Sequence, residues 1–574
     1  MDLLIYVVIL NRLSTDITGS DLRRTVMADT NSTNKPTNGT VPRPYNEQLT
    51  VRALVIGAIG SVIIAASSMY VALRLGALPW PTVFVALLSM AALRALGNTN
   101  LNEINVTHTA MSAGAMIAGG FAFTIPAIWI LQPDTPISFP PLILVALAGT
   151  ILGLVLTALI RRHFIETAAL PYPVGTAAYE TVQVGDEGGG KAAILFGSMG
   201  ISAVFVAARD LIAAVPAAIT SARLAAKNIF VGFWLAPIAL GIGYIIDVVY
   251  TGVWFAGSIF AYVILVPVGL SIGLFPDLAA AEAFRSSLGI GLMVGTGVGV
   301  LVKGILPRMK AIFAGVVSDL SESGNRRLAI SLPVGGAVVG FLLSFLAGIP
   351  ALPAVLLLVG VVVATVMAAD LTGQTGINPM EIMGIIVLLG VRLVVPSLGQ
   401  TEAILIAAVV AVSCGLTGDV LNDFKAGYLF HTSPRAQITA ETVGGIIGAL
   451  VSVGTFAVLL TRYGSFGGEL PAPQAHAVAA LAAGIPNITS FVIGGAVGLI
   501  VYLLGWPGMT LGLGVYLPMM ISAPVFLGGL IRLVVRKFKP AWDEKGVVAA
   551  SGFLGGEGVT GVIIAIIQVS RGLF

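Results

Sequence analysis

The segment from residue 370 to residue 384, DLTGQTGINPMEIMG, places two carboxylates and two amides between apolar runs of membrane-spanning length. Gly373 and Gly376 would allow the chain to unwind there, and Pro379 would suit the first turn of the helix that resumes. A broken helix leaves free N–H groups on one half-helix and free carbonyl groups on the other, which can hold the charged parts of a solute. The segment therefore predicts half of a solute-binding site, with an ordinary surface loop as the alternative.

Titratable and amide side chains in this segment define the first candidate residues. Glu381 would lie in the first turn of the resumed helix, where the dipole favours its anionic form and a proton or cation would compete for it. Gln374 and Asn378 would contact the solute. A partial copy of the segment, GNTNLNEINVTH, begins at residue 97 and aligns Asn105 with Asn378 and His108 with Glu381. His108 is accordingly a second proton-site candidate, with a packed, hydrogen-bonded histidine as the alternative.

Composition places these residues in a membrane protein. Of the 574 residues, 57% are hydrophobic and 10% are charged, against about 25% charged residues in ordinary soluble domains. Apolar windows of about 17 to 25 residues predict about sixteen transmembrane helices. Polar or Gly-rich segments are expected to interrupt them at 97–108, 171–191, 370–384, 418–445 and 555–561. The predicted fold is an all-α polytopic membrane protein with broken or re-entrant segments, because a transmembrane barrel would show alternating strands of about ten residues.

We expect three parts along the chain. Residues 28–46 are polar and contain prolines, and we expect residues 1–46 to form a disordered cytoplasmic tail. The partial copy lies about 274 residues from the original, so residues 47–287 and 288–574 would form two pseudo-symmetric halves of eight helices with a site between them. Lysines and arginines are more frequent in loops on the terminal side, which favours cytoplasmic termini, although a basic cluster at 532–539 weakens this bias.

Several function classes lack the residues that they need. The segment GDEGGGKA has the spacing of a phosphate-binding loop, but Ala192 stands where a Ser or Thr would bind magnesium. The sequence has no hydrophilic stretch long enough for a nucleotide-binding domain and no HExxH zinc motif, so we expect neither ATP-driven transport nor an enzyme. Basic runs interleaved with aromatics are missing, which argues against nucleic-acid binding. Cys414 is the only cysteine, which excludes an intramolecular disulfide.

Other polar residues near the apolar runs complete the candidates. Glu557, in GGEGVTG, would be an intramembrane acid at an unwound point or a residue near the headgroups. Glu180 is a further proton-site candidate. The solute path could be lined by two tyrosines and two cations, namely Tyr179, Tyr428, Lys425 and Arg435. The two cations could attract a carboxylate, or they could anchor a re-entrant turn at the cytoplasmic side.

The segment LNDFKAGYLFHTSPRAQITAETVGGIIGAL, from residue 421, resembles the oligopeptide transporter (OPT) superfamily, nearer to the yellow stripe-like metal-chelate branch and its prokaryotic members. The motif residues are Asp423, Phe424, Lys425, Gly427, Tyr428, Leu429, Ser433, Pro434 and Arg435. Similar pieces are NEQLTVRALVIGAI, YPVGTAAYETV, LTGQTGINPMEIMG and GGEGVTGV, in the expected order. The resemblance implies sixteen helices, cytoplasmic termini and proton-coupled import of peptides or peptide-like metal chelates.

These observations predict a secondary active, proton-coupled importer of small peptides or peptide-like metal chelates in the plasma membrane. Its partners would be the solute, protons and the lipid bilayer, and a homo-oligomer stays open. We expect no resident metal and no cofactor, with the proton gradient as the energy source. The alternative is a passive channel for polar solutes, which also needs polar residues at membrane depth.

Overall fold

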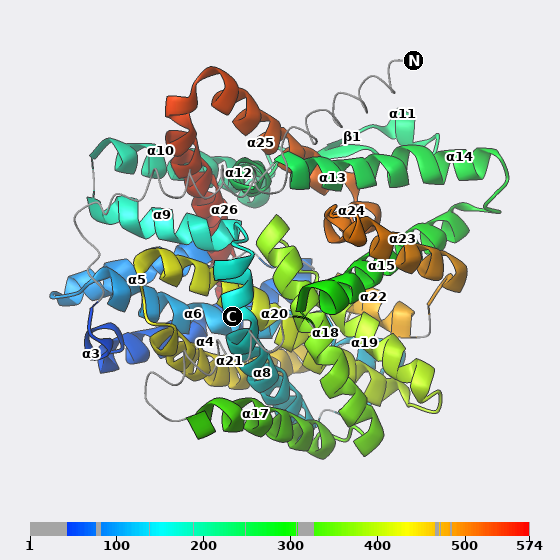
Figure 1. Cartoon of the computed structure of the whole chain (residues 1–574), viewed down its shortest axis with the longest axis horizontal. Helices are drawn as coiled ribbons and strands as arrows, with labels where there is room; N and C mark the ends of the chain where they lie inside the picture. Colours follow the sequence, from blue (N-terminus) through cyan, green and yellow to red (C-terminus); the bar gives the residue numbers. More distant parts are fainter. Residues whose placement is uncertain are drawn as a thin grey trace. The chain divides into compact units, whose positions relative to one another are not determined.

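The described chain is built from helices joined by short connections (Figure 1). The computed structural model describes residues 43–75, 78, 82–136, 138–187, 189–246, 248–305, 307, 326–464, 466, 470, 472–482 and 485–572. Most of the expected N-terminal tail, residues 1–42, lies outside these ranges, and Tyr45 and Asn46 begin the first described helix.

The first part of the chain, as described up to residue 305, contains thirteen α-helices, four π-helical turns and two short strands. The helices are α3 (Tyr45–Gln48), α4 (Val51–Leu75), α5 (Thr82–Leu96), α6 (Leu101–Ala122), α7 (Ala127–Leu131), α8 (Phe139–Arg162), α9 (Pro173–Glu187), α10 (Gly189–Val206), α11 (Ala222–Ala225), α12 (Pro237–Ile245), α13 (Val248–Ile259), α14 (Val266–Ser271) and α15 (Leu278–Gly299). Wider π-helical turns occur at His163–Thr167, Ala207–Leu211, Phe260–Leu265 and Val300–Ile305. The strands β1 (Ala218–Thr220) and β2 (Gly232–Trp234) pair antiparallel, with Ile219 opposite Phe233.

The second part of the chain is described from residue 326. Its helices are α17 (Arg326–Leu346), α18 (Ala351–Thr375), α19 (Met380–Val394), α20 (Gln400–Phe430), α21 (Pro434–Tyr463), α22 (Pro473–Ala482), α23 (Ile488–Leu503), α24 (Gly508–Tyr516), α25 (Met519–Phe538), a 3₁₀ turn at Pro540–Trp542, and α26 (Asp543–Gly572). The predicted boundary between two halves, 287/288, falls inside α15, so any such division must lie before or after that helix. The two halves themselves stay a prediction.

Nine helical segments of the described chain are long and apolar enough to cross a membrane. They are Val51–Tyr70, Leu101–Leu131, Phe139–Thr167, Ala193–Leu211, Val248–Ser271, Ala351–Thr375, Gln400–Phe430, Pro434–Thr461 and Met519–Phe538. The prediction of an all-α polytopic membrane protein is confirmed. The count of sixteen stays a prediction, because other apolar helices, such as Thr82–Leu96 and Ile488–Leu503, are shorter than a bilayer requires.

Side-chain caps and left-handed residues set several helix ends. Asn100 starts α6 by accepting a hydrogen bond from the Glu103 N–H, and Asp277 caps α15 in the same way. Gly376, with φ of +70°, ends α18, and His431, with φ of +57°, ends α20. These capping residues and left-handed residues determine where the helices end, which the apolar pattern alone would not determine.

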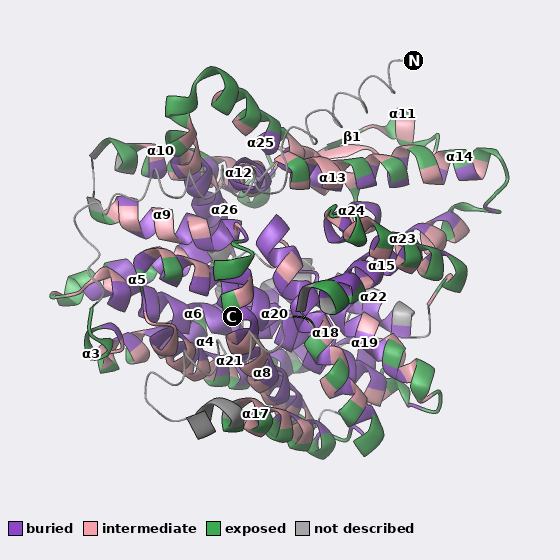
Figure 2. Ribbon diagram, in the orientation of Figure 1, coloured by how far each residue is buried: buried purple, intermediate pink, exposed green. Residues whose placement is uncertain are grey.

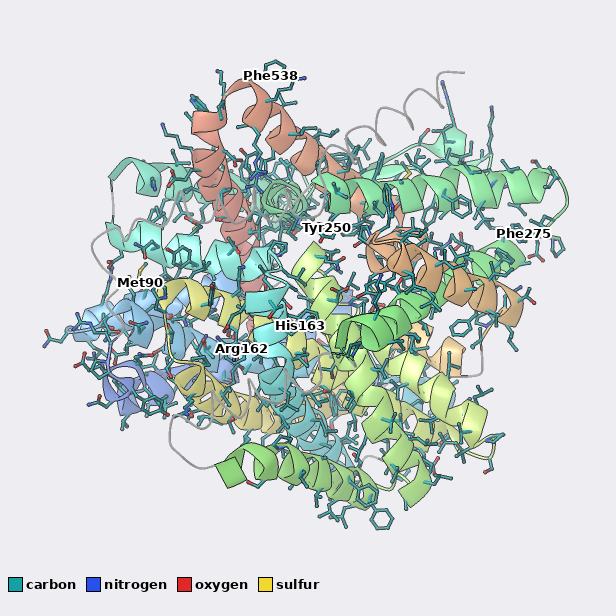
Figure 3. All side chains as sticks on the ribbon, in the orientation of Figure 1. Met90, Arg162, His163, Tyr250, Phe275 and Phe538 are labelled. Carbon is teal, nitrogen blue, oxygen red and sulfur yellow. The ribbon has the colours of Figure 1, made fainter. Side chains whose placement is uncertain are left out.

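Burial separates an internal layer from a lipid-facing one (Figure 2). The most apolar window of α20 is 100% buried, whereas those of Ala193–Leu211 and α25 are 28% buried. The outer segments present large apolar side chains outwards, including Ile212, Val204 and Phe538, the last of which lies at the periphery in Figure 3. An apolar exterior of this kind needs lipid as its solvent, and α20 is surrounded by protein.

Candidate functional site

Helix α20 is the internal element on which the candidate site is built. It packs against α6, α8, α9, α18, α19 and α21, so protein surrounds it. From Ser413 onwards it carries buried hydroxyl, amide and carboxyl side chains, namely Ser413, Thr417, Asp419, Asn422 and Asp423. The most apolar window of α20 is fully buried, so these polar side chains face neighbouring helices, and different faces of α20 make different polar contacts.

The helix break predicted at 370–384 is present and is packed on one face of α20. Helix α18 ends at Thr375, left-handed Gly376 turns the chain, and α19 begins at Met380 after Pro379. The Ile377 N–H is satisfied by Thr375 Oγ1 at 3.0 Å. Gly373, expected to help the unwinding, stays helical. The segment is therefore a buried break in a helix, and the surface-loop alternative is wrong.

Contacts to α20 and α24 fix the amides of the break. Asn378 Nδ2 donates to the Cys414 carbonyl at 2.7 Å, while its Oδ1 is buried without a hydrogen-bond partner. Gly418 leaves room for this amide, since a side chain at 418 would collide with Asn378 and crowd Thr372. Gln374 Oε1 accepts from Thr510 Oγ1 at 3.0 Å. The break thus presents one unused amide oxygen inside the protein.

Glu381 lies buried in the first turn of α19, as the sequence predicted. It forms no ion pair with a described lysine or arginine. Tyr516, at the C-terminal end of α24, is within electrostatic reach of it. Arg285 does not pair with Glu381 but donates to the carbonyl groups of Val515 and Tyr516, at 2.7 Å each. A carboxylate at a helix start without a side-chain cation can receive a cationic group or a proton.

The partial copy of the segment forms a different structure. Gly97 and Asn98, both with positive φ, separate α5 from α6. Glu103 accepts from Arg52 at 2.7 Å, and also from the hydroxyl groups of Thr50 and Thr99, so it anchors the start of α6. Asn105 is inside α6, five residues into the helix, and not at the break. The partial copy therefore also contains a helix break, but Asn105, the counterpart of Asn378, lies inside the following helix and not at the break.

Asn105 and Asn378 contact α20 at widely separated places. Asn105 Nδ2 donates to Thr432 Oγ1 at 3.3 Å, just beyond the end of α20, whereas Asn378 donates to Cys414. About 24 Å of helix axis separates Cys414 from Phe430, the last residue of α20, at about 1.5 Å per residue. The structure therefore does not bring these two amides to one contact on α20.

A cluster of three carboxyl groups lies on another face of α20, and we call Asp419, Asp423 and Glu441 the acid cluster. One oxygen of each lies within 4.8 Å of the others, and all three side chains are buried. Asp419 and Asp423 come from α20, and Glu441 comes from α21. The described residues offer no lysine or arginine in an ion pair with any of the three. Three anions this close would repel strongly, so they must be neutralised.

Helix α6 adds two polar side chains to the acid cluster. Ser112 Oγ donates to Asp423 Oδ2 at 2.6 Å, and His108 Nε2 lies 3.3 Å from Asp423 Oδ1. The two residues are four apart, so they share one face of α6. Of the predicted proton-site residues, His108 is therefore the one that the structure brings to the acid cluster.

The acid cluster was missed because its residues belonged to a segment expected as an interruption. Residues 418–445 are not a loop: α20 continues to Phe430, α21 begins at Pro434, and three residues connect them. The expected interruption at 171–191 is likewise mostly helical, in α9 and α10. The spacing of four between Asp419 and Asp423 was the available signal, because it places both carboxylates on one helix face.

Glu557 has a different environment from the one expected. Helix α26 runs from Asp543 to Gly572 through GGEGVTG without unwinding, so the predicted unwound point at Glu557 is wrong. Glu557 Oε1 accepts from Arg209 Nη2 at 2.9 Å and Oε2 accepts from the Ile238 N–H at 2.7 Å. Arg209 also binds Asp210 through two hydrogen bonds and the Leu235 carbonyl. This carboxylate is compensated, unlike those of the acid cluster.

The remaining candidates lie near the C-terminal end of α20. Tyr179 packs on Phe430 with ring centroids 4.7 Å apart, and Tyr428 is exposed. Lys425 Nζ donates to the Leu170 carbonyl at 3.0 Å. Glu180 and Arg435 are half-buried. None of these five belongs to the acid cluster or contacts the Asn378 amide through a hydrogen bond that the described residues show.

In this helical membrane protein, a broken helix packs against the internal helix α20, which also carries carboxyl groups without a cationic partner among the described residues. These two features are typical of a membrane transporter. The family model described as OPT oligopeptide transporter protein matches residues 48–568. The chain therefore belongs to the OPT oligopeptide transporter family, as the motif from Asp423 to Arg435 indicated. Members of this family are transporters, which confirms the expectation that the chain is not an enzyme.

Individual relatives agree with the family. The chain is 26% identical over 593 residues to a putative oligopeptide transporter of Haemophilus influenzae, covering 87% of this chain and 92% of that protein. Two Arabidopsis thaliana proteins match shorter parts: the metal-nicotianamine transporter YSL2, 37% identical over 79 residues, and the probable metal-nicotianamine transporter YSL8, 30% identical over 165 residues. These matches cover 13% and 25% of this chain, and 11% and 23% of the relatives. They support the resemblance to the yellow stripe-like branch.

Proposed function

We propose that this multi-pass membrane protein imports small peptides or peptide-like metal chelates across the plasma membrane, in symport with protons and with both termini in the cytoplasm. The observation that carries the proposal is the buried break between α18 and α19, with an unused Asn378 oxygen and a Glu381 carboxylate that pairs with no lysine or arginine among the described residues. The relatives named for oligopeptides and for metal-nicotianamine support the solute class.

The chemistry of the break suits a peptide-like solute. Such a solute carries amide N–H groups, and a peptide also carries an ammonium group at its N-terminus. Asn378 Oδ1 can accept from an N–H group, while Glu381 can pair with an ammonium group or with the amine of a chelator. Tyr179, Tyr428, Lys425, Arg435, Asn105 and Gln374 stay candidates for other parts of the solute path.

A proton gradient is the energy source that we propose. The sequence contains no nucleotide-binding segment, and buried carboxyl groups in membrane proteins commonly mark proton or ion pathways. Glu381, His108, Glu180 and Glu557 were the candidates for proton binding. Glu557 is the weakest of them, because Arg209 and the Ile238 N–H already hold its two oxygens.

Uptake into proteoliposomes tests this function. Purified protein is reconstituted and exposed to a peptide library and to iron chelates, with and without an inwardly directed proton gradient. We expect saturable uptake that exceeds equilibrium only when the gradient is present. Accumulation that persists after a protonophore collapses the gradient would exclude proton coupling. Non-saturating flux far above about 10³ solutes per second would favour the alternative, a passive channel, over alternating access.

Replacing Asn378 by alanine tests the solute site directly. We expect Asn378→Ala to raise the KM for the solute about tenfold, because about 1.4 kcal/mol is typical of one lost hydrogen bond to a solute. The measurement is the concentration dependence of uptake. Asn46→Ala, on the exposed helix α3, is the matched control and should leave the KM unchanged. An unaltered KM in a well-folded Asn378→Ala protein would remove this residue from the solute site.

A further inference from the structure

The acid cluster contains more buried acceptor atoms than the described chain satisfies. Both oxygens of Asp419, both oxygens of Glu441 and Oδ1 of Asp423 lie buried without a hydrogen bond. A buried polar atom without a partner is costly, and a buried anion without a counter-charge is costlier still. Five such atoms in one place indicate that something binds there.

Two buried side chains from other helices point to the same place. His108 Nε2 has no hydrogen-bond partner and lies 3.3 Å from Asp423 Oδ1. Thr82 Oγ1, at the start of α5, is also buried without a partner and is close enough to Asp419 to interact with its carboxyl group. The charged groups that face the acid cluster are therefore His108 from α6 and the three acids of α20 and α21.

Contacts among the three acids favour protons as the bound species. Asp423 and Glu441 approach closely enough for a hydrogen bond between their carboxyl groups, which exists only if a proton lies between them. Asp423 Oδ2 already accepts from Ser112, which leaves Oδ1 for His108 or for Glu441. A proton on one carboxyl group converts repulsion between two anions into an attractive hydrogen bond.

We infer that the acid cluster, with His108, is the site at which the coupling protons bind and are released. This inference rests on the proposed function. It assigns proton coupling to Asp419, Asp423 and Glu441, none of which the sequence analysis named as a proton site, in place of Glu180 and Glu557. Protons enter as H⁺ from one side of the membrane and leave as H⁺ on the other, so no bond other than O–H or N–H forms or breaks.

Helix α20 connects this proton site to the solute site. Asp419 directly follows Gly418, the residue against which the Asn378 amide and the Thr372 hydroxyl pack. One helix turn further, Asn422 Oδ1 accepts from the Gly175 N–H at the start of α9, at 3.0 Å. Loss of a proton from the acid cluster would restore repulsion between the carboxylates and push α20 and α21 apart. Because Asn378 packs against Gly418, the same displacement of α20 would move the surface that Asn378 contacts. The two sites are thereby linked through one rigid element.

The test separates coupling from transport. Asp423→Asn, Glu441→Gln and Asp419→Asn remove the charge and keep the shape, so each mimics a permanently protonated residue. Gradient-driven accumulation should fall by at least about tenfold, a typical size for coupling between sites. Solute counterflow between equal pH values should persist, because it needs no net movement of protons. Glu402→Gln, at the other end of α20, is the matched control and should accumulate solute normally.

The outcomes distinguish this inference from the proposed function. If the wild-type protein accumulates solute independently of the pH gradient, the proposed function fails. If the wild type is proton-driven and all three neutral variants remain fully proton-driven, the acid cluster is not the proton site. Wild-type uptake that requires Na⁺ or a divalent cation, and loses that requirement in the variants, would show that the cluster binds this cation and would overturn the proton assignment.

A direct binding measurement covers the case in which a variant does not fold. Wild-type protein in weakly buffered detergent solution should take up protons when solute is added, as reported by a pH-indicator dye. His108→Gln keeps a polar side chain and leaves the three acids in place, and it should change the pH at which this uptake is half-maximal. Identical proton uptake curves for wild type and His108→Gln would contradict the assignment of His108 to the site.

Discussion

Arg209→Met is expected to destabilise the folded protein by about 3–5 kcal/mol, the usual cost of removing one partner from a buried ion pair. Arg209 is held between Asp210 and Glu557 and also binds the Leu235 carbonyl. Its loss leaves Glu557 buried with the Ile238 N–H as its one remaining partner among the described residues. Thermal unfolding of the detergent-solubilised protein measures the effect.

Two further variants control this prediction. Arg223→Met removes an arginine from α11 that is exposed to solvent, and it should change stability by less than about 0.5 kcal/mol. The double variant Arg209→Met with Glu557→Gln removes the unpaired charge and should recover much of the lost stability. An Arg209→Met protein as stable as Arg223→Met would show that the Arg209 network contributes nothing measurable.

Gly448→Leu is expected to prevent normal packing of α21 against α6. A side chain at position 448 would overlap the Cα of Gly114, a backbone atom that cannot move without moving the helix. Because this contact joins the two helices that complete the acid cluster, we expect a loss of about 3 kcal/mol or more. The protein should lose its single symmetric peak in size-exclusion chromatography after mild heating.

Gly454→Leu is the matched control on the same helix. Gly454 is exposed, and a Cβ there meets no atom within 4 Å. Leucine has a better helix propensity than glycine by up to about 1 kcal/mol, so this variant should be as stable as the wild type or slightly more stable. Equal behaviour of the two leucine variants would mean that α6 and α21 are not in the close contact described.

Local chemistry made part of the site predictable. Gly373, Gly376 and Pro379 carry strong backbone preferences, and these indicated a helix break and placed Glu381 in the first turn after it, although Gly373 itself stays helical. The family motif from Asp423 to Arg435 could also be recognised from the sequence, because its residues are contiguous. Features that depend on neighbours a few residues away could therefore be derived from the sequence.

The acid cluster depends on contacts that sequence spacing does not encode. Ser112 and Asp423 meet across 311 positions, and Arg209 and Glu557 across 348. Helical spacing can place Asp419 and Asp423 on one face, but it cannot say which helix that face meets. Apolar windows were misleading at this point, because they interpret carboxylates in a long segment as a loop, whereas a helix enclosed by protein on all sides can carry them.

The short link between α20 and α21 has a consequence for how the protein is made. When α20 emerges during synthesis, α6 is already present, but α21 begins only after three more residues, and Glu441 lies a further two turns into it. Until then Asp419 and Asp423 lack most of their final surroundings, and lipid would be a poor substitute. We therefore expect α20 and α21 to enter the bilayer together as a hairpin, because a link of three residues lets α21 follow α20 directly and cover its carboxyl groups.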